Sequence, residues 1–209
     1  MTTPLRLPIF PLPDLTFFPH TLLPLHVFEA RYRSMISDSM ARDRRIAVVA
    51  LEPGYEKTYD GRPAVRRVAG VGRIVRCERL SNGRFNILLR GDQRVRIERE
   101  LPADTLYRFV EATPLDEVGG DGPEAQALGR AVGERCLQIL ETLGRSSKET
   151  RESIASVRSP AELGDQVASA VIPDPALRQA LLEELDVEKR LRRLGDALDD
   201  LFQRLSRGR

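Results

Sequence analysis

The spacing of apolar residues divides the chain into an N-terminal part with strand-like patterns and a C-terminal part with helical ones. Up to residue 115, apolar residues form short runs or alternate with polar residues, as they do in β-strands. After residue 123 they recur every three or four residues, which places them on one face of a helix. The intervening segment, DEVGGDGP, combines glycines, acids and a proline. We therefore predict domains at 1–115 and 124–209, joined by a linker at 116–123.

The stretch Leu7–Tyr32 is apolar, but its prolines exclude a single helix because proline fixes φ and removes a backbone donor. Its uncharged run is also too short for a membrane span, which needs about 20 apolar residues. We predict two short strands around a turn, at Leu7–Leu12 and Leu22–Phe28. Most of the stretch is expected in the core, which leaves the turn from Phe17 to His20 as a contact surface.

The rest of the strand-like part contains one predicted helix and several predicted strands. The helix covers Glu29–Met40, where the apolar spacing changes to three and four. Ile46–Leu51 is an unbroken, largely β-branched run, which favours a strand buried on both faces. A loop rich in glycine and proline is expected at 52–63, and Ser81-Asn82-Gly83 is typical of a hairpin turn. The other predicted strands are 68–80, 84–90, 93–100 and 106–115, with a break at Gly91-Asp92.

The helical part carries clear start signals. Ser159-Pro160-Ala161-Glu162 is a capping box with proline in the first turn, Asp174-Pro175 starts another helix, and Asp186 can cap the last one. Helices are also predicted at Ala125–Leu143 and, with weaker periodicity, at Ser146–Val157. The leucines of the last helix span only two heptads, which favours packing within a bundle over an intermolecular coiled coil.

Charge is unevenly distributed, although the net charge of the 209 residues is only +2. Residues 1–115 contain 19 Lys and Arg against 13 Asp and Glu, whereas residues 116–209 contain 14 against 18. Nearly all cations of the first part are arginine, which fits either contact with a polyanion or a GC-rich genome. The two isolated cysteines, Cys77 and Cys136, and the lack of a recognisable signal peptide lead us to expect a cytoplasmic protein.

The sequence contains no recognisable motif for catalysis, cofactors or metals, so we expect no catalytic residue, no cofactor and no metal. A Walker cradle is missing, and Gly70-x-Gly72 is better explained by a bulge or a close backbone approach than by a dinucleotide site. His26 and Glu29 lack a further ligand in the sequence around them. The serines and lysine of 146–153 lie in a polar segment, whereas a serine nucleophile needs a buried, oriented base.

Several blocks of the sequence, in order, resemble a known family. LPIFPL at Leu7–Leu12 and FPHTLLPLHVFEARY at Phe18–Tyr32 resemble the opening of the N-terminal, substrate-binding domain of Lon proteases. GVGRIV at Gly70–Val75 and NGRFNILLRGDQRVRI at Asn82–Ile97 keep the family's order, and the helical part looks like its C-terminal bundle. The resemblance implies an α+β fold, an N-terminal PUA-like β-barrel followed by a C-terminal α-helical bundle. Full Lon proteases continue into ATPase and protease domains, whose motifs this chain lacks, so a stand-alone, ATP-independent domain is expected.

The resemblance implies a non-catalytic module that recognises unfolded or exposed apolar segments of other proteins, for instance as a protease adaptor. An extended peptide could add to a sheet edge, or bind an apolar groove between barrel and bundle. The candidate peptide contacts are Phe17 and Phe18 in the opening turn and Tyr55 and Tyr59 in the long loop. The alternative for all four is hydrophobic packing under a loop.

Two other functions stay open. RNA binding is favoured by the positive first part, because PUA-like barrels are shared with RNA-modifying proteins and arginines contact phosphate. The strand arginines concerned are Arg73, Arg76, Arg84, Arg94 and Arg96. An uncharacterised hydrolase is the third hypothesis. No membrane partner is expected, and the sequence does not predict the oligomeric state.

Overall fold

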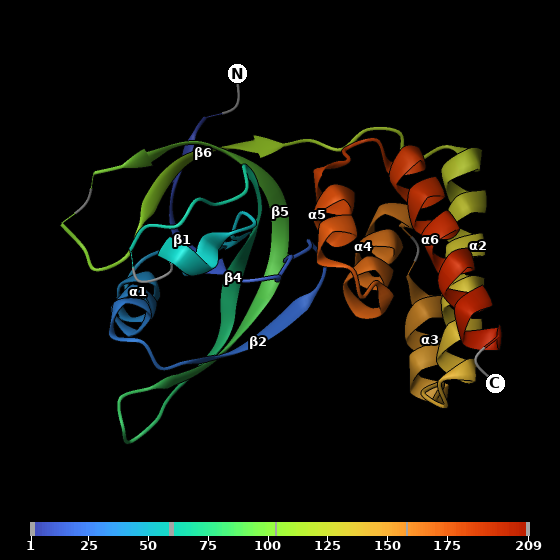
Figure 1. Cartoon of the computed structure of the whole chain (residues 1–209), viewed down its shortest axis with the longest axis horizontal. Coiled ribbons are helices and arrows are strands. Elements are labelled where there is room, and N and C mark those ends of the chain that lie inside the picture. The colour runs from blue at the N-terminus through green and yellow to red at the C-terminus, as the bar shows by residue number, and fades with distance from the viewer. Residues whose placement is uncertain (1–2, 59–60, 103, 158, 208–209) are drawn as a thin grey trace. The chain divides into compact units, whose positions relative to one another are not determined.

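The computed structural model describes residues 3–58, 61–102, 104–157 and 159–207 (Figure 1). Its internal contacts divide the chain into two compact units, Met1–Leu115 and Asp116–Arg209. The described strands all lie in the first unit, together with one α-helix, and the second unit holds five α-helices. The α+β fold expected from the sequence, with strands before helices, is confirmed.

The first unit is built on one curved, six-stranded sheet. Its elements are β1 (Leu5–Leu12), β2 (Leu22–Val27), α1 (Ala30–Met40), β3 (Arg45–Ala50), the 3-10 helix η1 (Tyr55–Thr58), β4 (Val68–Arg79), β5 (Phe85–Leu101) and β6 (Phe109–Leu115). The strand order is β2-β5-β4-β3-β1-β6, and β6 pairs with β5 as well. The pairings of β5, β4, β3, β1 and β6 therefore form a closed circuit, and β2 is an additional strand on β5.

The two strands predicted in the opening stretch are confirmed as β1 and β2, and they have different partners: β1 lies between β3 and β6, whereas β2 pairs with β5. The prediction of a break at Gly91-Asp92 was wrong, since β5 continues through it as one 17-residue strand. What changes there is the neighbour of β5: residues 85–90 pair with β2, and residues 94–101 pair with β6.

Glycines in β4 and β5 admit the backbone that leads into β2. A Cβ at Gly70 would lie 1.8 Å from the carbonyl oxygen of Phe17, and a Cβ at Gly91 would lie 2.1 Å from that of Phe18. Any other residue would therefore clash with main-chain atoms. The close backbone approach predicted at Gly70-x-Gly72 is confirmed, and a register shift in the β4–β5 pairing accompanies it.

β1 and β3 are buried on both faces because alternate residues enter two apolar clusters. In β3, Ile46 and Val48 enter one cluster, and Ala47 and Val49 enter the other. The first cluster also receives the buried face of α1, formed by Tyr32, Met35 and Ile36. The second consists of alternate residues of the five strands in the circuit, so it fills the circuit's interior. The strand predicted at Ile46–Leu51 is thus confirmed as buried on both faces.

The second unit contains the helices α2 (Pro123–Thr142), α3 (Lys148–Ser156), α4 (Pro160–Val171), α5 (Pro175–Glu183) and α6 (Val187–Arg207). The predicted N-caps Ser159 and Asp186 are confirmed, because each accepts a backbone N–H from the first turn of the next helix. Asp174, where a helix start was predicted, caps its helix in the same way. α6 packs against α2 and α4, as expected for a bundle. Its buried leucines are Leu191, Leu194 and Leu198.

A buried arginine joins several parts of the second unit. Arg190 of α6 is 1% exposed, and its Nη2 lies 2.5 Å from Oε1 of Glu117. Its Nε lies 3.6 Å from Oδ1 of Asp165 in α4, and its Nη1 donates to the carbonyl oxygen of Glu184 at 2.8 Å. Asp165 is itself fully buried. A charge in this position requires its partners, since an isolated buried ion is costly.

Candidate functional site

The solvent-facing side of β2 is unusually apolar. Leu22 is 61% exposed and Phe28, just after the strand, is 59% exposed. Pro24 and His26, between them, are exposed as well. Alternate residues of a strand point to the same side, so these four form one row. The solvent side of an antiparallel strand is normally polar, which makes this row a candidate contact surface. On the other side, Leu23, Leu25 and Val27 pack on the core.

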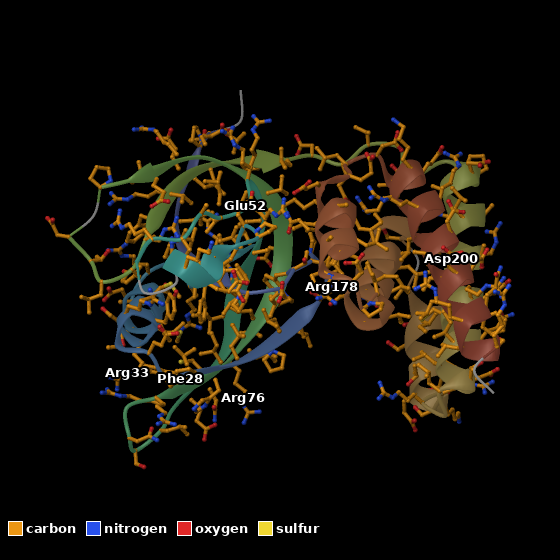
Figure 2. The ribbon with its side chains drawn as sticks, viewed as in Figure 1. Phe28, Arg33, Glu52, Arg76, Arg178 and Asp200 are labelled. Atoms are coloured by element: carbon orange, nitrogen blue, oxygen red, sulfur yellow. The ribbon has the colours of Figure 1, made fainter. Side chains whose placement is uncertain are left out.

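Strand pairing continues this row onto β5 and β4. Leu88 lies between Pro24 of β2 and Arg76 of β4, and Arg90 lies opposite Arg73. A register shift before Arg76 leaves Val75 45% exposed. Figure 2 labels Phe28, which directly follows β2, and Arg76 of β4, and β2 and β4 are the two outer strands of this surface. The surface, termed the outer face, consists of Leu22, Pro24, His26, Phe28, Arg73, Val75, Arg76, Glu78, Asn86, Leu88 and Arg90.

The outer face carries positive charge beside its apolar row. Arg73 of β4 lies opposite Arg90 on one side and Arg45 on the other, and like charges in such pairs are destabilising. Arg90 has the carboxylate of Asp92 at 3.8 Å. Within the described ranges, neither Arg73 nor Arg76 has an ion-pair partner. Their guanidinium groups are therefore available to a carboxylate or phosphate of a ligand.

Hydrogen bonds and ring stacking hold His26 in the outer face. Its Nδ1 lies 2.8 Å from Oδ1 of Asn86, which can only accept, so Nδ1 carries a proton. The amide nitrogen of Asn86 donates to Glu78 at 3.5 Å, and the imidazole stacks on Phe28 with ring centroids 6.4 Å apart. Glu29 binds Arg31 instead, at 2.9 Å. His26 and Glu29 do not form a catalytic pair, and His26 is a positioned surface aromatic.

β2 also presents an open backbone edge, since β5 is its one partner among the described strands. The carbonyl oxygen of Thr21 accepts from Gly91 of β5 at 2.9 Å. Alternation along the strand then turns the backbone groups of Leu22, Pro24 and His26 away from β5. Proline has no N–H, so the edge can offer donors only from Leu22 and His26. Such a proline is a common protection of an edge strand against uncontrolled pairing.

The structure does not bring the four predicted contact residues together on one surface. Phe17 is 2% exposed and Phe18 is fully buried, so the prediction that their side chains form a contact surface was wrong. Tyr55 is half-buried in η1, and Tyr59 lies outside the described residues. Leu22 and Phe28 were not predicted as contact residues, because most of this stretch was assigned to the core. The available signal was that LLPLHVF is apolar at every position except His26, so a strand buried on one side must expose some of its apolar residues.

The other chemical candidates are accounted for structurally. Ser147 caps α3 by accepting from the N–H of Thr150, and Lys148 pairs with Glu152 at 3.7 Å on the surface. Burial raises the pKa of the Cys136 thiol to about 11, and it also raises the pKa of Cys77. Both thiols are therefore poor nucleophiles at neutral pH. In the described ranges, no group of three or more His, Cys, Asp or Glu could hold a metal ion, and no helix could cross a membrane.

Comparison with known proteins gives the family. A family model described as the ATP-dependent protease La (LON) substrate-binding domain matches residues 6–200. This chain belongs to the Lon substrate-binding domain family. The Lon protease of Azospirillum brasilense is 30% identical to it over 188 residues, and Lon protease 1 of Syntrophobacter fumaroxidans is 29% identical over 188 residues. Each match covers 90% of this chain but 23% of the relative, so the Lon-like chain spans about a quarter of these proteins.

Two solved structures share the fold of this Lon substrate-binding domain. The N-terminal domain of the Mycobacterium avium complex Lon protease superposes with a TM-score of 0.76 at 21% identity, covering 93% of this chain and 98% of that one. The Lon N-terminal domain protein from Xanthomonas campestris gives a TM-score of 0.65 at 23% identity, covering 91% and 96%. The family suggested by the sequence blocks is thus confirmed, and the fold agrees over nearly the whole chain.

Proposed function

We propose that this domain binds unfolded or apolar-exposed segments of other proteins through the outer face. The observation that carries the proposal is the row of Leu22, Pro24, His26 and Phe28, which leaves apolar side chains in solvent beside the free arginines Arg73 and Arg76. The substrate-binding description of the family supports a protein ligand. The role is recognition without catalysis, and the bound segment would be delivered to a protease.

The backbone of β2 limits how a segment can bind. With Pro24 in the middle of the open edge, a full ladder of hydrogen bonds to an added strand cannot form, and donors remain only at Leu22 and His26. Most of the binding free energy must then come from side chains. Burying a leucine or phenylalanine side chain fully is worth about 1.5–3 kcal/mol, and Leu22 and Phe28 still expose 61% and 59%. Each should contribute about 1–2 kcal/mol.

This contribution sets the expected effect of mutations. Replacing Leu22 or Phe28 with serine should weaken binding by about 5- to 30-fold, because 1.4 kcal/mol corresponds to a factor of ten. Both side chains are largely exposed, so the fold should be retained. Leu106→Ser is the matched control, since Leu106 is 70% exposed but lies after β5, away from the segment 85–90 that pairs with β2.

The experiment is a fluorescence anisotropy titration of labelled casein, an unfolded protein, with the chain and these three variants. The proposal predicts saturable binding that Leu22→Ser and Phe28→Ser weaken and Leu106→Ser leaves unchanged. Equal affinities for all four proteins would refute the outer face as the binding surface. Casein should also remain intact, with or without ATP, and its cleavage would contradict a role without catalysis.

RNA binding is the second candidate, and Arg73 and Arg76 favour it because they have no ion-pair partner in the described part of the chain. Phosphate contacts release counterions, so RNA affinity should fall steeply with salt. An Arg73→Gln, Arg76→Gln double variant separates the two candidates. Loss of RNA binding with casein binding unchanged would support RNA as the ligand. If the ligand is instead an acidic protein segment, the double variant should bind casein more weakly, and RNA should give no complex at low salt.

A further inference from the structure

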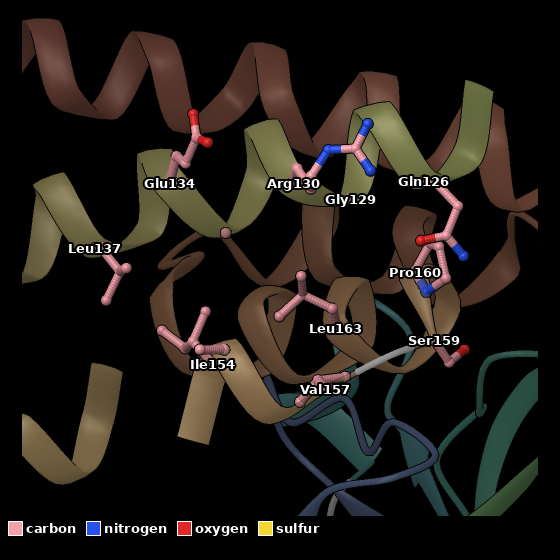
Figure 3. Close-up of a pocket in the computed structure, with 12 residues that line it drawn as sticks. Gln126, Gly129, Arg130, Glu134, Leu137, Ile154, Val157, Ser159, Pro160 and Leu163 are labelled. Atoms are coloured by element: carbon pink, nitrogen blue, oxygen red, sulfur yellow. The ribbon is translucent and has the colours of Figure 1, made fainter. Parts of the chain in front are cut away.

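The short helix α3 lies over a groove between α2 and α4 that it does not fill. None of its nine residues is buried. Two cavities of about 230 and 370 Å³ lie along it, and Ile154 and Leu163 line both. Figure 3 shows the smaller one, with Ile154 and Leu163 labelled. Ile154 is the one α3 residue common to the two cavities. A single half-buried side chain of α3 therefore separates two spaces in one continuous groove.

The groove is largely apolar, with polar groups at its margins, whereas apart from Ile154 the side of α3 that faces it is small or polar. Cys136 and Leu140 of α2 line the larger cavity, together with Gln166, Val167, Ala170 and Val171 of α4. Toward this cavity α3 presents Glu149, Thr150 and Ser153 beside Ile154. Toward the smaller one it presents Ala155 beside Ile154, and that cavity is lined by Gly133, Leu137, Pro160 and Leu163 and by the polar side chains of Gln126, Arg130 and Glu134. α3 thus makes few of the apolar contacts that the groove offers, and each unfilled space forfeits dispersion energy.

Apart from Ile154, polar contacts at the N-terminal end hold α3. Arg151 forms an ion pair with Glu141 of α2 at 2.7 Å, and its Nε donates to Ser146. Ser147 caps the helix. An exposed ion pair contributes little to stability, and a helix of this length is marginal without packing. The helix is therefore attached weakly to a groove that could bind a better-fitting one.

We propose that this groove binds an amphipathic helix of another protein, and that α3 is its weak intramolecular occupant. The contacts of α3 define the partner's chemistry. It carries an apolar anchor at the position of Ile154 and a basic residue three positions earlier, where Arg151 meets Glu141. Large apolar residues at the positions of Thr150 and Ser153 would fill the larger cavity. These positions follow the spacing by which an amphipathic helix binds a groove. The site is independent of the outer face.

The probe is a labelled, acetylated and amidated peptide of residues 146–157 carrying Thr150→Leu and Ser153→Leu. A control peptide carries Ile154→Asp in addition. Both are titrated into the full chain, into an Ile154→Asp variant that loosens α3, and into a Ser153→Leu variant that holds α3 more firmly. The proposal predicts that the probe binds the Ile154→Asp variant at least tenfold more tightly than the unmodified chain. The Ser153→Leu variant should bind it more weakly than the unmodified chain, and the control peptide should not bind.

Cys136 gives a second readout, because it is 2% exposed and lines the larger cavity. In a Cys77→Ser background it is the only thiol. Its alkylation by iodoacetamide should be faster in the Ile154→Asp variant, slower in the Ser153→Leu variant, and slowed again when the probe is added. Circular dichroism confirms that the other helices are retained.

Three results would overturn the proposal. The first is that the probe binds none of the three proteins, or binds all three equally. The second is that the control peptide binds as well as the probe, which would show unspecific apolar contact. The third is that the chain dimerises and that the protection of Cys136 increases with protein concentration as the dimer forms, which would make a second copy the occupant.

Discussion

Replacing Arg190 with methionine should destabilise the helical unit strongly, because it removes the cation from a buried ionic cluster. Arg190 is 1% exposed and Asp165 is fully buried. The guanidinium group lies 2.5 Å from Glu117 and 3.6 Å from Asp165, and it donates to the carbonyl oxygen of Glu184. Methionine keeps the length of the side chain but offers no charge and no donors. Asp165 would then hold its charge in the interior without this cation.

Removing one partner of a buried ion pair costs about 3–5 kcal/mol. Domains are stable by only about 5–15 kcal/mol, so this loss is a large share of the total. Replacing both partners is much less costly, since no buried charge is then left behind. An Arg190→Met, Asp165→Ala double variant should therefore be more stable than Arg190→Met alone. Glu117 is partly exposed and can be solvated in both variants.

The assay is urea unfolding followed by far-ultraviolet circular dichroism, which mainly reports the second unit because it holds five of the six described α-helices. Arg192→Met is the matched control. Arg192 lies on the same helix as Arg190, α6, but at the surface, where it pairs with Glu124 of α2. The effect of this substitution on stability should be small, because ion pairs exposed to solvent contribute little. The reasoning is refuted if Arg190→Met costs no more than Arg192→Met, or if Asp165→Ala destabilises the Arg190→Met variant further.

Three further predictions concern single side chains. Burial and its hydrogen bond to Asp38 (2.8 Å) raise the pKa of Tyr107 to about 12, above the value of about 10 in an unfolded chain. Stability from Tyr107 should be full below pH 10 and be lost as pH rises toward 12, and Tyr107→Phe should remove that dependence in urea titrations. Gly91→Ala places a Cβ 2.1 Å from the carbonyl oxygen of Phe18 and should lower the free energy of unfolding of the first unit by about 3 kcal/mol or more. Tyrosine fluorescence follows this unit, because all four tyrosines precede residue 116. Gly133→Ala should instead stabilise α2 by about 0.5–1 kcal/mol in thermal unfolding, since its Cβ would make ordinary contacts at 3.4 and 3.5 Å; a loss of stability would contradict this.

Local signals were sufficient to predict most elements of the fold. Helix starts at Ser159, Asp174 and Asp186 depend on neighbouring residues only, and the structure shows each of these caps. Strand partners depend on distant segments, which is why the pairing of β1 with β3 and of β2 with β5 was not predicted. Gly91-Asp92 was misread as a break for the same reason. Its glycine is required by the backbone of Phe18, which lies 73 positions earlier in the sequence.

The candidate site was less predictable than the fold. Aromatic residues in a turn suggested exposure, yet the main chain of Phe17 and Phe18 lies against Gly70 and Gly91, and both side chains are buried. Phe28 belongs to the same apolar stretch and is exposed, because it follows a strand that pairs on one edge only. A sequence shows that such residues are apolar, but their exposure depends on which strands flank them.

The casein affinity of Phe28→Ser, compared with that of Leu106→Ser, tests the central claim most directly. Both substitutions remove a large exposed apolar side chain from the first unit, and only Phe28 belongs to the outer face. If the outer face binds apolar segments, Phe28→Ser raises the dissociation constant by about 5- to 30-fold and Leu106→Ser leaves it unchanged. Equal dissociation constants for the two variants and the unmodified chain would contradict the account.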